Sequence, residues 1–235
     1  MGKQKVFSSK LIKMKIQNKF FASFCLFILI SISSSAHTMA YDLENMSKVN
    51  LFWEYLKLGF QHILPLGFDH ILFVLGIFLF NPKLKIVLAQ VTCFTIAHSI
   101  TLALAMNNII HPQGVIVEPF IALSIVFIGV ENILVRELKW WRLIVVFLFG
   151  LIHGLGFAGV LAEIGLPEKD FISALISFNI GVEAGQTAII LLAIFVFQTR
   201  FSNRSWYRKF VTIPVSLCIS LIALYWVIER TQSIF

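Results

Sequence analysis

Six apolar segments, each long enough to cross a lipid bilayer, take up most of this chain. They cover residues 62–80, 84–106, 115–135, 142–162, 170–198 and 209–228, and short polar connections join them. A membrane-spanning helix needs about 20 apolar residues, and short connections favour antiparallel neighbours. The chain is 58% hydrophobic and 13% charged, whereas soluble domains average about 25% charged residues. The sequence therefore predicts an all-α fold, a polytopic membrane bundle of six transmembrane helices.

The N-terminal region has the pattern of a secretory signal peptide. Lysines crowd the first nineteen residues, an apolar run covers 20–32, and small residues lead up to Ala40. This order of basic, apolar and small residues predicts a cleavable signal peptide over 1–40 and a transmembrane domain over 41–235. A retained signal anchor is the alternative. An amphipathic pattern over about 50–61 predicts an interfacial helix that leads into the first span.

The net charge of +7 does not indicate a nucleic-acid partner, because six of the lysines belong to the predicted signal peptide. With the signal cleaved, the mature N-terminus lies outside. The first, third and fifth connections, which carry most of the remaining Lys and Arg residues, then lie inside. This distribution follows the positive-inside rule.

Ionisable and amide side chains lie inside five of the six apolar segments. A charged group at the bilayer centre costs about 2.5–3.5 kcal/mol on insertion scales, so such residues usually face the bundle interior and have partners. Imidazoles and carboxylates at similar depths suit a divalent transition metal such as nickel, zinc or cobalt. The predicted metal ligands are His62, Asp69, His70, His98, His153 and Glu183. The predicted supporting residues are Glu118, Glu131, Asn179 and Gln186, which could orient the ligands.

Structural roles compete with this interpretation. A single histidine inside a span often only hydrogen-bonds a neighbouring helix. Glu118 precedes Pro119 and could cap a helix start. Glu131 could lie in the membrane interface, offset by Arg136. Polar residues in five spans together favour a shared site.

Five stretches together resemble the HupE/UreJ family of bacterial membrane proteins. They read HILPLGFDHILFVLGIFLF, FTIAHSITLALA, VEPFIALSIVFIGVEN, FGLIHGLGFAGVLAEIGLP and FNIGVEAGQ, between His62 and Gln186. The resemblance implies a nickel or related divalent-metal function, with Asp69 and His70 as the signature pair. Six residues separate His62 from Asp69, a longer spacing than in the better-known members, so the chain resembles a divergent branch.

The leading hypothesis is transport or handling of a divalent transition metal in a bacterial inner membrane, and a transporter is favoured over an enzyme. The expected partners are the lipid bilayer and the metal ion, and homo-oligomer formation stays open. Two alternatives remain. An intramembrane metal-dependent hydrolase could use three histidines and a carboxylate base, although the chain lacks HExxH and G-x-S-x-G sequences. An accessory membrane protein could use the same polar residues only to hold helices together.

Overall fold

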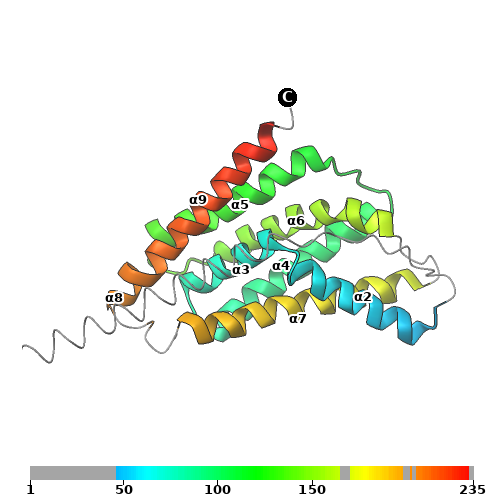
Figure 1. Cartoon of the computed structure of the whole chain (residues 1–235), viewed down its shortest axis with the longest axis horizontal. Coiled ribbons are helices and arrows are strands. Elements are labelled where there is room, and N and C mark those ends of the chain that lie inside the picture. The colour runs from blue at the N-terminus through cyan, green and yellow to red at the C-terminus, as the bar shows by residue number, and fades with distance from the viewer. Residues whose placement is uncertain (1–45, 165–169, 198–201, 203–204, 233–235) are drawn as a thin grey trace, which may run out of the picture. The chain divides into compact units, whose positions relative to one another are not determined.

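The computed structural model describes residues 46–164, 170–197, 202 and 205–232, and every regular element in this part of the chain is a helix (Figure 1). The long helices are α2 (Lys48–Ile63), α3 (Phe68–Phe80), α4 (Leu84–Met106), α5 (Gly114–Leu134), α6 (Arg142–Ile164), α7 (Phe171–Phe197) and α9 (Ile213–Gln232). Short α8 (Ser205–Tyr207) and one π-helical turn, η5 (Arg208–Thr212), lead into α9. The prediction of an all-α fold is confirmed. The predicted signal peptide lies outside the described residues.

Five helical segments are long and apolar enough to cross a membrane, namely α4, α5, α6, α7 and the continuous run from η5 through α9. A sixth candidate span is formed by α2 and α3 together, which meet at an angle of 69°. The observed bounds of the last five spans agree with the predicted segments to within a few residues. The sequence predicts the first span over 62–80, but the candidate span begins at Lys48 and is interrupted between Ile63 and Phe68. Large apolar side chains are exposed on the outer faces, among them Phe195 and Ile172, as expected where lipid replaces water.

The helices pack as close pairs, α4 with α6, α2 with α7 and α5 with α9, and α3 contacts α4, α5, α7 and α9. Glycines bring the first two pairs into close contact. A methyl group at Gly154 of α6 would collide with the His98 carbonyl oxygen of α4. A methyl group at Gly181 of α7 would collide with the Leu56 carbonyl oxygen of α2. Gly150 of α6 likewise meets the Phe94 carbonyl oxygen of α4, so both of these α6 glycines face α4.

Helix α2 lies along the first half of α7 and runs in the same direction (Figure 1). Lys48 forms an ion pair with Asp170 just before α7, and Ile63 packs on Gly185 near its middle. The buried face of α2 repeats every four residues, at Leu51, Tyr55, Gly59 and Ile63. The sequence predicts an interfacial helix over about 50–61, and in the structure these residues pack on α7.

The break between α2 and α3 therefore lies beside the middle of α7. Leu64 to Gly67 form a turn, and Gly67 packs against the backbone carbonyl of His62. Helix breaks at membrane depth are tolerated where the backbone is enclosed by protein. Transporters commonly place substrate beside such discontinuous helices.

Candidate metal centre

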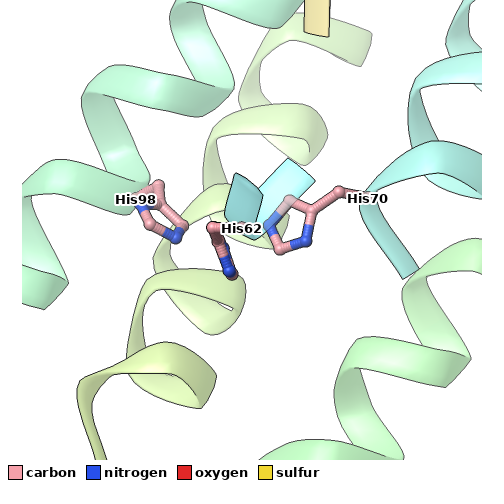
Figure 2. A group of neighbouring side chains, drawn as sticks. All are labelled: His62, His70 and His98. Carbon is pink, nitrogen blue, oxygen red and sulfur yellow. The ribbon is translucent and has the colours of Figure 1, made fainter. Parts of the chain in front are cut away.

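Three histidines from separate elements meet at the break in the first candidate span. His62 ends α2, His70 begins α3 and His98 lies inside α4. Figure 2 shows their imidazole rings turned toward a common space. One nitrogen from each ring lies within 4.8 Å of the other two. Nitrogens bound to one tetrahedral zinc-sized ion are roughly 3.3 Å apart, so a small closure of these side chains would let them share an ion.

The fold explains why these rings meet. His62 and His70 flank the turn at 64–67, so the chain reversal brings them together, with ring centroids 4.6 Å apart. His98 arrives from α4 and its ring lies 5.8 Å from that of His62 and 5.9 Å from that of His70. Phe157 and Phe94 border the cluster, at 3.9 Å from the His62 ring and 5.7 Å from the His70 ring. The imidazoles therefore lie in an apolar enclosure.

The nitrogens of this cluster lack protein partners. Within the described residues, no hydrogen-bond partner is found for buried Nε2 of His62 or Nε2 of His70. Neither ring nitrogen of His98 makes a hydrogen bond of normal geometry, although the Asn179 side chain lies beside this ring. A buried polar atom without a partner costs about 1–3 kcal/mol, and such atoms are uncommon in native proteins. A cation bound between the rings would give these lone pairs a partner. The donor set therefore fits a divalent transition metal.

His153 of α6 adjoins the cluster as a fourth imidazole. Its ring lies 5.0 Å from that of His70. Its Nε2 is 2.9 Å from the Ser124 hydroxyl oxygen on α5, and that hydroxyl donates to the Ile121 carbonyl. Because the Ser124 hydroxyl proton is then engaged by the Ile121 carbonyl, the Ser124 oxygen accepts a hydrogen bond from the Nε2–H group of His153. This arrangement leaves Nδ1 of His153 as an acceptor.

The two predicted carboxylate ligands have other partners in the structure. Asp69 receives two hydrogen bonds from Arg230 of α9, both at 3.1 Å. Glu183 of α7 accepts a hydrogen bond of 2.7 Å from Thr92 of α4. Neither carboxylate belongs to the group of mutually close histidine nitrogens. Their role as ligands stays a prediction.

The predicted supporting residues lie in three different places. Glu118 is exposed near the start of α5, and its backbone carbonyl accepts a hydrogen bond from Arg230. Asn179 and Gln186 lie on α7, on the side that faces α4. Glu131 lies toward the other end of the bundle, where it pairs with Arg142 rather than with the expected Arg136.

Arg142 and its partners form a buried polar group near the ends of four helices. The Arg142 guanidinium ion-pairs with Glu131 of α5 and donates to Gln90 of α4 at 2.8 Å. It also lies 4.1 Å above the Phe80 ring at the end of α3. The side chains of Arg142 and Glu131 are 1% and 5% exposed. This pair links the helices that carry His70, His98 and His153.

Sequence reasoning missed both arginines and Thr92. Glu131 lies in the last turn of α5 and Arg142 is the first residue of α6, so the two residues flank one short connection. Opposite charges on either side of a short connection were a usable signal. Arg230 is 161 residues from Asp69, and no local pattern links the two.

These observations define a class: a multi-pass helical membrane protein whose bundle encloses a group of imidazoles suited to a metal ion. The chain belongs to the HupE/UreJ family, because the family model described as HupE / UreJ protein matches residues 37–230. This confirms the resemblance seen in the sequence. The family is associated with nickel and cobalt uptake and consists of transporter-like membrane proteins. Neither the search of curated proteins nor that of solved structures found a match.

Proposed function

We propose that this protein carries a divalent transition-metal ion, nickel or a related ion, across a bacterial inner membrane. His62, His70 and His98 bind the ion, and His153 lies beside them as a further nitrogen donor. The observation that carries the proposal is the convergence of three imidazoles with unpartnered buried nitrogens at a helix break. Family membership supports the choice of cargo.

The geometry suggests how the ion is handled. Neutral imidazoles replace the water ligands of the ion with nitrogen ligands and add no negative charge. This favours reversible binding of the ion, as transport requires. The ion-paired residues Asp69 with Arg230, and Glu131 with Arg142, lie on opposite sides of the cluster along the bundle. In this proposal the Asp69 side is outside and the Arg142 side is inside, as the distribution of basic residues predicts.

A hydrolase is less well supported by the same geometry. A metal-bound water would need a general base close to the ion. Asp69 is engaged by Arg230 and Glu183 by Thr92, so no carboxylate stands ready beside the three imidazoles among the described residues. We therefore propose transport rather than catalysis.

Metal binding by the purified protein tests the proposal directly. We expect the wild type to bind about one Ni²⁺ or Co²⁺ ion per chain, and His70→Ala or His98→Ala to weaken binding by at least about tenfold. The same variants should reduce uptake of ⁶³Ni²⁺ into proteoliposomes to background. His111→Ala is the matched control, since His111 is exposed in the connection between α4 and α5.

Two results would contradict the proposal. Wild-type binding that is unchanged by both histidine substitutions would show that the ion binds elsewhere. Binding without any flux in proteoliposomes would favour an accessory protein that holds a metal but does not carry it.

A further inference from the structure

A strip of oxygen-bearing side chains runs along the contact between α4 and α7, beside the histidine cluster. We call it the oxygen strip, and its members are Thr92, Thr95, Asn179, Glu183 and Gln186. The residues of α4 are three apart, and those of α7 are four and three apart, so each set lies on one helix face. Thr95 precedes His98 by one turn, or about 4.5 Å along the helix axis.

Two hydrogen bonds cross this contact. Thr92 Oγ1 donates to Glu183 Oε1 at 2.7 Å, and Thr95 Oγ1 donates to Gln186 Oε1 at 2.9 Å. Gln186 is fully buried, and no partner is found for its Nε2 within the described residues. Asn179 is half-buried, and its side chain lies beside His98. The strip is therefore polar and partly buried, since Thr95 and Gln186 are buried and Thr92, Asn179 and Glu183 are half-buried. The oxygen atoms of the strip are the groups that can bind a cation, because an amide nitrogen only donates.

Among the described residues, Glu183 differs from Asp69 and Glu131 in having no arginine partner. Asp69 and Glu131 each form an ion pair with an arginine. No basic side chain pairs with Glu183 in the part of the chain that the structure describes, although this residue lies near the middle of α7. A carboxylate at that depth is expensive without a compensating cation. The Thr92 hydroxyl supplies a hydrogen bond to Glu183 but no charge.

The ligand chemistry of the strip differs from that of the histidine cluster. It offers one carboxylate, two hydroxyls and two amide groups, so its donors are hard oxygen atoms, which suit hard cations rather than nickel or zinc. One negative charge matches one monovalent cation. We propose that the oxygen strip is a second cation site, that it binds Na⁺, and that Na⁺ bound there is coupled to the transition metal at the histidines.

The coupling follows from the shared helix and rests on the proposed transport function. Na⁺ at Glu183 would draw α4 and α7 together at Thr92 and Thr95, one turn from His98 on the same helix. If both ions favour the same position of α4 against its neighbours, each ion changes the affinity of the protein for the other ion by the same factor. An inward Na⁺ gradient could then drive metal entry.

Thermal unfolding of the purified protein tests the site without requiring transport. Replacing choline by Na⁺ at equal ionic strength should raise the wild-type Tm by about 3 °C at tenfold excess over the dissociation constant. Glu183→Gln and Thr92→Val should lose that shift, and Thr92→Ser should keep it. Glu137→Gln, which removes an exposed carboxylate, is the control and should respond as the wild type does.

Ni²⁺ serves as the second probe in the same assay. Glu183→Gln should still be stabilised by Ni²⁺, and His98→Ala should still be stabilised by Na⁺ but not by Ni²⁺. An inward Na⁺ gradient should speed ⁶³Ni²⁺ uptake into wild-type proteoliposomes several-fold, and Glu183→Gln should lose this acceleration.

The two proposals fail separately. No Na⁺ shift in the wild type, or an equal shift in Glu183→Gln, overturns the second site. Uptake that responds to a pH gradient and ignores Na⁺ also overturns it. Na⁺ stabilisation that depends on Glu183, without any Ni²⁺ binding, would support the second site and contradict the proposed function.

Discussion

At the scale of single residues, the polar groups inside this bundle follow two arrangements. Some are paired with an oppositely charged or hydrogen-bonding side chain, and others lie close to groups of their own kind. Arg142 shows the paired case, with Glu131 and Gln90 as its partners and Phe80 beneath its guanidinium. The imidazoles show the gathered case, since their nitrogens meet without protein partners. Both arrangements reduce the cost of polar groups away from water, the first through protein contacts and the second, in our proposal, through a bound ion.

The Glu131–Arg142 pair should respond differently to single and double substitution. Removing one partner of a buried pair leaves the other charge uncompensated, which costs about 3–5 kcal/mol. We expect Glu131→Leu or Arg142→Met alone to lower the Tm by roughly 6–12 °C. The double variant should recover a large part of that loss, because neither charge remains. Additive losses, measured by thermal unfolding in detergent, would show that the pair is not coupled.

At the scale of elements, the site depends on how closely α2 and α4 approach their partner helices. Gly181 lets α2 lie against α7, which sets the position of His62 at the end of α2. Gly154 lets α6 lie against α4 beside His98. Backbone contact thus positions His62 from six residues away, at Leu56, and His98 at its own carbonyl.

A methyl group at Gly181 should separate α2 from α7. We expect Gly181→Ala to destabilise the protein by about 1–3 kcal/mol, as overpacking commonly does, and to weaken Ni²⁺ binding roughly tenfold. Gly159→Ala is the control, because no atom lies within 4 Å of the added methyl group. Thermal unfolding and metal titration on the same samples separate the two effects. Unchanged binding in Gly181→Ala would mean that the position of His62 is not set by this contact.

At the scale of the whole molecule, the candidate spans imply a membrane setting, and the histidine cluster lies beside the break in the first of them. The α2–α3 break lies beside the middle of α7, so α2 and α3 together are the candidate for a sixth, broken span. Five further candidate spans follow, and six spans in all would place both ends of the domain on one side of the membrane.

The orientation can be measured with single cysteines in a cysteine-free background. Basic residues predict that the connection at Lys83 is inside and that at His111 is outside. Cysteine at position 111 should react with a membrane-impermeant maleimide in intact cells, and cysteine at position 83 should react only after permeabilisation. The reverse pattern would invert the proposed direction of entry.

The sequence by itself determined the class of fold and the family, and it pointed to the histidines of the candidate metal centre. Apolar length determines the spans because lipid requires it, and His62, His70 and His98 are conspicuous inside such segments. Only the tertiary structure decided which polar residues meet. Local spacing could place Asp69 near His70 but could not show that Arg230 holds it, since the two come from helices far apart in the chain. Partner choice between helices depends on their direction and packing, and in this bundle close contacts at Gly154 and Gly181 set both.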